Sequence, residues 1–305
     1  MREGFKQAIL ELGERDDFLL LTGDHGYSLF DEFKEQYPGK FLNMGVAESN
    51  MVCVAAGLAR AGFRPLIYGL AAFLPNRVYE FLKLQIALDS LPVTVIGDGG
   101  GLVYSTLGHS HQAIDDLALI GSLPNFQAFS PSSSRETATI LLDPLMSSKP
   151  KYLRLGKSDE TYRGGFPGGL VAPYLARRGV DKSIAIVSHG SMTSIVLEIL
   201  QHDSTVDFDV WSFPEISELG QSRISQFSSY SNLIVVEEHL EHGGLGSRFK
   251  SANFPHRPQI LSISASPGFH IGVGSYPWAL QQHDLGIEQI SRKIKDFSMH
   301  KSGNR

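Results

Sequence analysis

The sequence predicts an α/β protein built from two three-layer domains with parallel sheets. Three observations lead to this prediction. Short apolar runs alternate along the chain with longer amphipathic segments, which is the pattern of strands and helices in layered folds. Turn-forming glycines follow several of the apolar runs. The length of 305 residues corresponds to about two domains of ordinary size.

The first half of the chain supplies most of the expected elements. Its helices are expected where apolar residues recur every three or four positions, as at Phe5, Ala8, Ile9 and Leu12. Its strands are expected at short apolar runs that end in turn-forming residues. The expected helices are residues 2–12, 47–61, 77–88, 115–119 and 134–142, and the expected strands are residues 18–21, 40–44, 65–70, 91–96 and 127–130.

The second half repeats the alternation after an irregular connector rich in glycine, proline and arginine. Strands are expected at residues 183–187, 208–212 and 233–237, and helices at residues 193–201 and 216–227, with another helix opening at 243–246. Because parallel strands must be joined by long crossovers, the order favours parallel βαβ units in both halves. The predicted division is a first domain at 1–160, a linker at 161–180 and a second domain at 181–305.

Composition excludes several classes of protein. With 42% hydrophobic residues the chain can form packed cores, and a net charge of −5 without a dense Lys/Arg cluster argues against nucleic acid as a partner. No apolar stretch reaches the roughly 18 residues of a membrane span, and the N-terminus lacks the apolar region of a signal peptide. We therefore expect a cytoplasmic protein that does not enter membranes. The single cysteine, Cys53, is expected to be a small buried thiol in a reducing compartment.

The triplet Gly97-Asp98-Gly99, followed by Asn125, resembles the diphosphate and metal motif of thiamine-diphosphate enzymes. Carboxylate and amide oxygens suit a hard divalent cation that neutralises a diphosphate. In the genuine motif a helix follows the triplet, so that its N-terminus faces the phosphates. Here a loop rich in glycine and histidine follows instead. We interpret the resemblance as coincidental and predict no metal site on this chain.

Three further groups of residues have ordinary interpretations when they are taken alone. His109 and His111 have no third metal ligand at a recognisable spacing, so a polar loop with surface histidines is preferred. The pair Glu237-Glu238 lies near other polar residues, and an acidic, solvated loop between a strand and a helix is the preferred account. The glycines at 243–246 lack a P-loop lysine and are interpreted as the entry to a helix.

Glu48 has two open interpretations. A carboxylate just inside a helix N-terminus is common, and its default role is to complement the helix dipole. The residues around Glu48 are mostly small or apolar, however, which predicts a buried carboxyl with a raised pKa. Such a group is a candidate acid, or a hydrogen-bond donor to a buried base. The pattern alone does not decide between the two roles.

Taken in order, several segments resemble one family of enzymes. Residues 45–51 (GVAESNM) are similar to the pyrimidine-domain signature of transketolases and 1-deoxyxylulose-5-phosphate synthases, and residues 73–80 resemble the passage that follows it. Residues 110–118 are similar to a histidine-containing stretch of these enzymes, and residues 186–192 and 236–247 resemble their third domain. The similarity is collinear over essentially the whole chain. It covers only the last two of the family's three domains, so the chain resembles the small subunit of a split transketolase.

The resemblance implies a cofactor and a partner. Thiamine diphosphate would be shared with a diphosphate-binding, N-terminal transketolase subunit, which would also hold Mg²⁺ or Ca²⁺, in an α2β2 heterotetramer. The implied reaction is transfer of a two-carbon ketol unit between sugar or sugar-phosphate substrates. Two alternatives remain open: the β subunit of a 2-oxoacid dehydrogenase, which has the same domain order, and a non-catalytic subunit that kept the fold.

The resemblance also implies roles for the residues that would surround the cofactor. Glu48 matches the glutamate that hydrogen-bonds N1′ of the aminopyrimidine ring and promotes its catalytic tautomer. Leu70 and Phe73 match positions that wall this ring, with Phe73 supplying a stacking face. Asn76 falls at a neighbouring position on the cofactor side.

A second group of residues would meet the substrate. His111 matches the histidine that reaches the reacting carbon, where it could stabilise developing alkoxide charge. Arg154 matches a sugar-phosphate anchor, for which an arginine fork is suited. Ser28 and Arg2 fall at two further anchoring positions.

Three positions depart from the family pattern. Leu107 stands where the family usually has an aspartate that reads a sugar hydroxyl, and Gly99 and Gly100 stand where a histidine or arginine grips the acceptor phosphate. We expect the glycines to open space. Together the departures predict an atypical acceptor, such as a deoxy or nucleotide-activated sugar.

Overall fold

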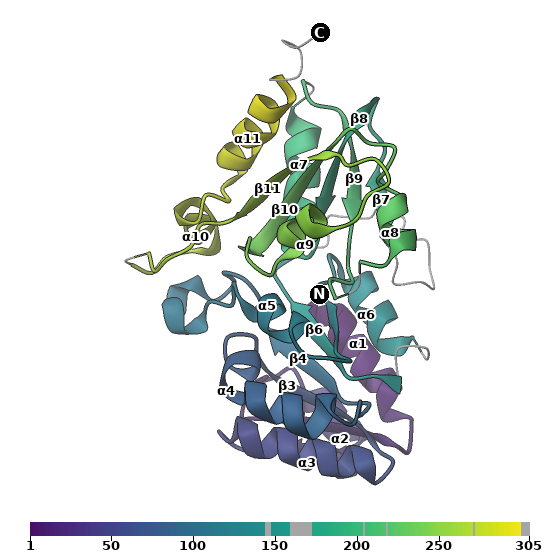
Figure 1. Cartoon of the computed structure of the whole chain (residues 1–305). Coiled ribbons are helices and arrows are strands. Elements are labelled where there is room, and N and C mark those ends of the chain that lie inside the picture. The colour runs from purple at the N-terminus through teal and green to yellow at the C-terminus, as the bar shows by residue number, and fades with distance from the viewer. Residues whose placement is uncertain (144–147, 159–172, 204, 218, 271, 300–305) are drawn as a thin grey trace.

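The computed structural model describes residues 1–143, 148–158, 173–203, 205–217, 219–270 and 272–299. Two α/β halves are stacked along the long direction of the molecule, and the N-terminus lies at their junction (Figure 1). This arrangement confirms the predicted α/β class. In the described part of the chain, no helix is both long enough and apolar enough to cross a membrane.

The first half contains a parallel sheet with the order β2-β1-β3-β4-β6-β5. Its strands are β1 (Phe18–Thr22), β2 (Phe41–Asn43), β3 (Arg64–Leu70), β4 (Thr94–Asp98), β5 (Gln127–Phe129) and β6 (Lys151–Leu155). Its helices are α1 (Arg2–Gly13), α2 (Asp31–Gln36), α3 (Glu48–Arg60), α4 (Leu74–Phe81), α5 (Asp116–Gly121) and α6 (Ser134–Leu142). The other helical segments are the 3-10 helices η1 (Pro38–Lys40), η3 (Ser105–Leu107) and η4 (His109–His111) and the π-helix η2 (Leu82–Ala87).

Alternating side chains of this sheet enter two different cores. Leu20 and Leu66 pack in one cluster with residues of α1, α2 and α6. The adjacent residues Leu21 and Ile67 pack in another cluster with residues of α3, α4 and α5. This alternation follows from the two-residue period of a strand. The sheet is therefore the middle of three layers, as the sequence predicts.

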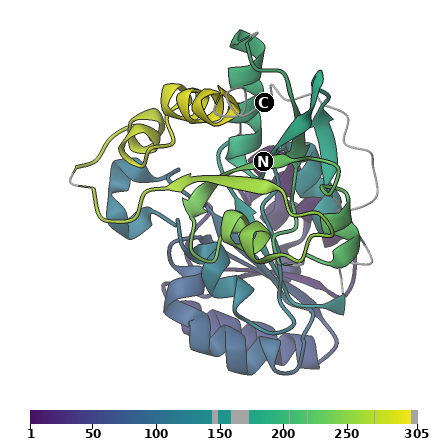
Figure 2. The ribbon, with the colours of Figure 1, turned by 45° about the horizontal axis from the view of Figure 1, so that its top comes forward.

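The second half contains a sheet with the order β11-β10-β8-β9-β7, with helices on both faces (Figure 2). Its strands are β7 (Tyr174–Arg177), β8 (Asp181–Ser188), β9 (Phe208–Ser212), β10 (Asn232–Leu240) and β11 (Gln259–Ala265). Its helices are α7 (Ser191–His202), α8 (Gln221–Ser225), α9 (Leu245–Ser251), α10 (Tyr276–Gln282) and α11 (Ile287–Met299). Strands β8 to β11 run parallel, as predicted, and the additional edge strand β7 runs antiparallel to β9, which makes this sheet mixed.

The predicted linker at 161–180 differs from the structure at its C-terminal end. Strand β7 lies inside it, and its hydrogen bonds to β9 make it part of the second sheet. Residues 159–172 lie outside the described residues.

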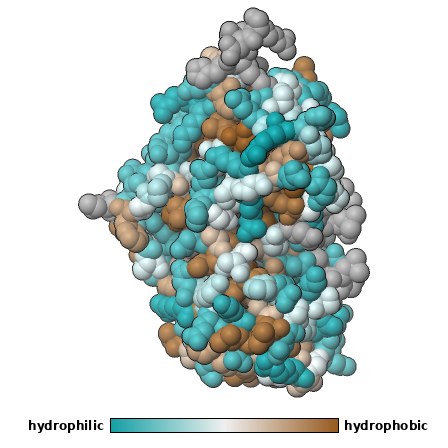
Figure 3. All heavy atoms as spheres, in the orientation of Figure 1, coloured by the Kyte–Doolittle hydropathy of each residue, from teal (hydrophilic) through white to brown (hydrophobic). Residues whose placement is uncertain are grey.

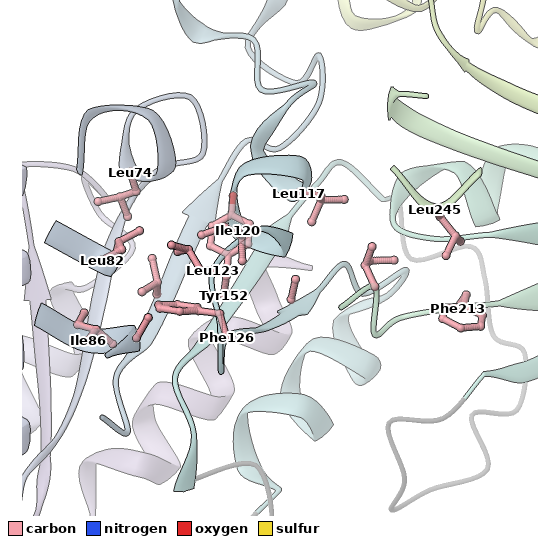
Figure 4. Packing of buried hydrophobic residues seen from close by; sticks show 14 of the residues in the cluster. Leu74, Leu82, Ile86, Leu117, Ile120, Leu123, Phe126, Tyr152, Phe213 and Leu245 are labelled. Atoms are coloured by element: carbon pink, nitrogen blue, oxygen red, sulfur yellow. The ribbon is translucent and has the colours of Figure 1, made fainter. Parts of the chain in front are cut away.

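The two halves share one hydrophobic core across their junction (Figure 4). Leu117 and Ile120 of α5 belong to the same cluster as Phe213 and Leu245 from the second half. Backbone hydrogen bonds also cross the junction. For example, Ile216 N donates to the carbonyl of Ala128 on β5, the edge strand of the first sheet. The halves are therefore packed together rather than joined only by a connector.

Several expected elements have different bounds. The helix expected at 134–142 is confirmed, whereas the one expected at 77–88 begins at Leu74 and continues as the π-helical η2. The helix expected at 216–227 is reduced to Gln221–Ser225 among the described residues. Elements that the sequence patterns do not predict are α2, β6, β7, β11, α10 and α11.

Cys53 is exposed, so the prediction of a buried thiol is wrong. The helical period places Met51, Val52 and Ala55 of α3 in the core and turns Cys53 to the opposite face.

Candidate active site

The order of strands in the first sheet indicates where a ligand is expected to bind. The chain moves from β1 outward to β2, then returns to the other side of β1 to form β3. In open α/β sheets, ligands bind beyond the carboxyl ends of strands where the order reverses in this way. The segments that follow β1 and β3, residues 23–30 and 71–73, therefore flank the expected crevice.

Glu48 enters this region from the end of β2. Gly45, with a φ of +67°, turns the chain between β2 and α3, and Glu48 is the first residue of that helix. The side chain is 8% exposed, which confirms the predicted burial. Its Oε1 accepts a hydrogen bond of 2.9 Å from Nη1 of Arg77. A buried carboxyl thus stands at a helix N-terminus with a cationic partner.

Phe73 is the centre of a small cluster of side chains. It follows β3, and its ring centroid lies 5.1 Å from that of His111 and 6.0 Å from that of His25. The guanidinium of Arg77 lies over the ring, 4.0 Å from its centroid. Phe73 therefore brings together segments that follow β1, β3 and β4.

Sequence reasoning missed His25 and Arg77. The Nε2 atom of His25 is buried and has no hydrogen-bond partner within the described ranges. An unpaired buried nitrogen is costly, so a ligand atom in this cluster would satisfy it. The available signals were the position of His25 directly after a strand and the position of Arg77 one helical turn after Phe73.

The other residues expected near the cofactor lie close to Phe73 along the chain. Leu70 ends β3 and is partly buried, and Asn76 lies exposed in the first turn of α4. The amide of Asn76 donates to the carbonyl of Ala72 at 3.4 Å. Ser28 is exposed in the loop after β1, where it adopts a left-handed conformation with φ of 59°.

In the Gly97-Asp98-Gly99 triplet, the carboxylate of Asp98 binds the guanidinium of Arg2. Asp98 is buried and forms an ion pair with Arg2, which is 58% exposed. The hydroxyl of Tyr104 donates to Oδ2 of Asp98 at 2.5 Å. The hydrogen-bonded carboxylate of Asp98 raises the pKa of Arg2, which keeps the predicted anchor charged.

Asn125, the other member of the apparent metal motif, is engaged separately. Its amide donates to the carbonyl of Ala87 at 3.0 Å. Asp98 therefore orients Arg2, while Asn125 ties a loop to η2. No group of three potential metal ligands occurs within the described ranges.

The glycines after β4 do not open space, so that prediction is wrong. A Cβ atom on Gly99 would overlap the ring of Tyr104, and one on Gly100 would lie 2.6 Å from Nε of Arg154. A Cβ on the next residue, Gly101, would overlap the carboxyl of Glu238. The missing side chains are replaced by three large neighbours that pack against the backbone.

We expect Gly100→Ala to lower the free energy of unfolding by about 1–3 kcal/mol, because the added methyl overlaps the buried side chain of Arg154. Urea denaturation followed by circular dichroism measures this change. The matched control is Gly57→Ala in α3, where nothing lies within 4 Å of the new methyl. Replacing a helical glycine there is expected to be neutral or stabilising by up to about 1 kcal/mol. Equal stability of the two variants would contradict the packing described here.

Arg154 lies at the junction of the halves rather than at an open crevice. Its side chain is 3% exposed, and Nε donates to Oδ2 of Asp116 at 3.0 Å. Nη2 donates to the carbonyls of Ala113 and Glu238 at 2.7 and 2.8 Å. A buried guanidinium engaged in this way favours a structural role and offers no support for the predicted sugar-phosphate anchor.

The acidic pair on β10 is buried, so the expected solvated loop is wrong. Glu237 accepts hydrogen bonds from the backbone nitrogens of Leu245 and Gly246 at 2.7 and 2.9 Å, which satisfies the start of α9. Glu238 accepts from the backbone nitrogen of Leu102 at 2.6 Å, across the junction. The glycines at 243–246 are confirmed as a helix entry.

Comparison with known proteins agrees with this geometry. A family model described as the pyrimidine-binding domain of transketolase matches residues 1–161. The chain belongs to the transketolase family. The transketolase expectation from the sequence is thereby confirmed, and the match to the pyrimidine-binding domain covers about half of the chain.

Relatives of known name include two kinds of enzyme. This transketolase-family chain is 26% identical over 302 residues to an apulose-4-phosphate transketolase subunit of Phocaeicola vulgatus, covering 97% of this chain and 96% of that protein. It is 28% identical over 277 residues to 1-deoxy-D-xylulose-5-phosphate synthase of Histophilus somni, covering 87% of this chain but only 43% of that enzyme.

A solved structure supports the fold of the whole transketolase-family chain. It is described as a split gene transketolase in an inactive beta4 tetramer, and it superposes with a TM-score of 0.80 at 25% identity. The superposition covers 97% of this chain and 96% of that one. The similarity therefore extends through both halves, beyond the residues that the family model matches.

Proposed function

We propose that this chain is the small subunit of a two-component, thiamine-diphosphate-dependent transketolase. It would transfer a two-carbon ketol unit from a ketose phosphate to an aldehyde or keto-sugar acceptor. The observation that carries the proposal is the convergence of Glu48, Phe73 and His111 at the carboxyl edge of the first sheet. Three separate segments contribute one acid, one aromatic face and one imidazole to the same place.

These residues fit the aminopyrimidine half of the cofactor. Glu48 is a buried carboxyl, Phe73 offers an aromatic face beside it, and Nε2 of His25 is buried without a partner within the described ranges. Together they suit a flat ring with nitrogen atoms on its edge. When bound, thiamine diphosphate supplies a thiazolium carbon that reacts with the ketose carbonyl.

The residues of this chain would each do one physical task. Glu48 would hold a proton against the ring nitrogen, and Phe73 would fix the plane of the ring by stacking. His111 hydrogen-bonds through Nδ1 to the hydroxyl of Ser110 at 2.9 Å. We assign its Nε2 to the substrate oxygen on which negative charge develops.

We propose that the diphosphate, with Mg²⁺ or Ca²⁺, binds to a separate polypeptide in an α2β2 heterotetramer. The chain spans nearly the full length of a protein that is itself named as one subunit of a transketolase, but less than half of the longer synthase. Exposed apolar side chains near the start of α3 and along η2 offer contact area, namely Val46, Leu84 and Leu88. Hydrophobic residues gather over the part of the surface where α3 and α4 lie (Figure 3).

The proposed acceptor is a sugar outside the usual aldose phosphates, such as a deoxy or nucleotide-activated sugar. Support comes from Leu107, whose side chain is 55% exposed on the loop that also carries His111. An apolar side chain at this point does not hydrogen-bond a sugar hydroxyl. The glycines at 99 and 100 give no support, because their neighbours fill the space.

Reconstitution tests the proposal. The chain alone is expected to show no ketol transfer with xylulose 5-phosphate as donor, and the chain copurified with a diphosphate-binding subunit is expected to turn over. Turnover by the chain alone would contradict the split architecture. Ribose 5-phosphate as the best acceptor by a wide margin would contradict the atypical acceptor, and oxidation of a 2-oxoacid with a lipoyl acceptor would favour a dehydrogenase.

A further inference from the structure

Arg77 occupies the place that the proposed function gives to the cofactor ring. Its Nη1 donates to Oε1 of Glu48 at 2.9 Å, and its guanidinium lies 4.0 Å from the centroid of Phe73. These two contacts, a hydrogen bond to the buried carboxyl and stacking on the aromatic face, are the ones assigned above to the aminopyrimidine. His25 and His111 also contact the ring of Phe73. Arg77 therefore covers a face of Phe73 on which an incoming ring would stack.

A guanidinium and an aminopyrimidine share the chemistry that this place selects. Both are flat, both carry N–H groups in the plane, and both stack on aromatic rings. Only one of them can lie between Glu48 and Phe73 at a time. Binding of the cofactor ring therefore requires the side chain of Arg77 to leave.

The strength of the contact suits a group that is displaced. The side chain of Arg77 is 51% exposed, so its ion pair with Glu48 is partly screened by water. Stacking on Phe73 adds a contribution of similar size. Together they are expected to weaken ring binding about tenfold, which corresponds to about 1.4 kcal/mol.

We propose that Arg77 is a placeholder for the aminopyrimidine ring, and this inference rests on the proposed function. In the unassembled subunit the guanidinium compensates the buried charge of Glu48 and covers Phe73. When the ring enters, the guanidinium moves into solvent on its flexible stem. The carboxyl of Glu48 and the face of Phe73 are then free to contact the ring in place of the guanidinium.

Binding of a cofactor fragment tests the placeholder directly. The probe is 4-amino-5-hydroxymethyl-2-methylpyrimidine, titrated into the full chain without partner and followed by calorimetry and by the imidazole NMR signals of His25 and His111. Arg77→Ala is expected to bind the probe about tenfold more tightly than the unmodified chain. Arg77→Lys keeps the charge but loses the flat fork, so its affinity should fall between the two.

The matched control is Arg60→Ala. Arg60 is a partly exposed arginine that pairs with Asp89 on the surface and contacts neither Glu48 nor Phe73. Its removal is expected to leave the affinity for the probe unchanged. An equal gain in this control would show a general effect of net charge and would overturn the placeholder.

The outcomes separate this inference from the proposed function. Arg77→Ala binding the probe no more tightly than the unmodified chain overturns the placeholder. If Glu48→Gln then abolishes binding of the probe in both the unmodified chain and Arg77→Ala, the proposed binding site for the aminopyrimidine ring is still supported. If Arg77→Ala gives no binding at all and the turnover of the assembled pair does not depend on Glu48, both the placeholder and the proposed function fail.

Discussion

Glu48→Gln is expected to reduce ketol transfer by the assembled pair by about 10²–10⁴-fold while the subunit stays folded. Glutamine has nearly the shape of glutamate, and its carbonyl oxygen can still accept the hydrogen bond from Arg77. The amide cannot give up or take back the proton that the ring nitrogen needs. The change should therefore appear in kcat rather than in stability.

Steady-state rates of the reconstituted pair, together with the melting temperature of the subunit, measure this effect. Glu80→Gln is the matched control, because Glu80 is exposed on α4 and the same charge is removed. Its turnover should equal that of the unmodified pair. Unchanged turnover of Glu48→Gln would instead favour a non-catalytic subunit that kept the fold.

Arg154→Met is expected to lower the free energy of unfolding by about 3–5 kcal/mol. The substitution leaves Asp116 buried with its remaining hydrogen bond from the hydroxyl of Tyr152 at 2.7 Å, but without its cation. It also leaves the carbonyls of Ala113 and Glu238 without the donor that joins the two halves. The double variant Arg154→Met with Asp116→Asn should recover part of the loss.

Urea denaturation distinguishes this structural role from a phosphate anchor. Arg135→Met on α6 is the control, because Arg135 is exposed and its loss should change stability by less than about 0.5 kcal/mol. If Arg154→Met unfolds like the unmodified chain but raises KM for a sugar phosphate, then Arg154 is an anchor and the structural account fails.

The layered architecture could be predicted because it depends on local patterns. Apolar runs and helical spacing indicate β1, β3, β4, α3 and α6 correctly, since each of these buries one face or both. Strand β7 escapes prediction because it lies at an edge, next to a connector of similar composition. Helix α11 is also missed, although Ile287, Ile290 and Ile294 have helical spacing.

The candidate site was predictable only where the local sequence constrains it. Small and apolar neighbours of Glu48 indicate its burial, and the structure agrees. The contact between Glu48 and Arg77 joins residues 29 positions apart and depends on how α3 packs against α4. No pattern in either segment reveals such a contact.

Two errors have a common physical cause. The interpretations of Gly100 as open space and of Glu237 as a solvated acid each consider only the residue itself. In the structure, Arg154 fills the space beside Gly100, and backbone nitrogens of α9 satisfy Glu237. What surrounds a residue is set by tertiary packing, which composition does not record.

The core that runs through both halves limits how the protein can be recombined. Phe213 and Leu245 belong to the same cluster as Leu117 and Ile120, so this part of the core is closed only when both halves are present. A chimaera that takes its first half from another family member would place foreign side chains against these four. We therefore expect a chimaera of two halves to fold stably only when the core residues on both sides of the junction come from the same protein.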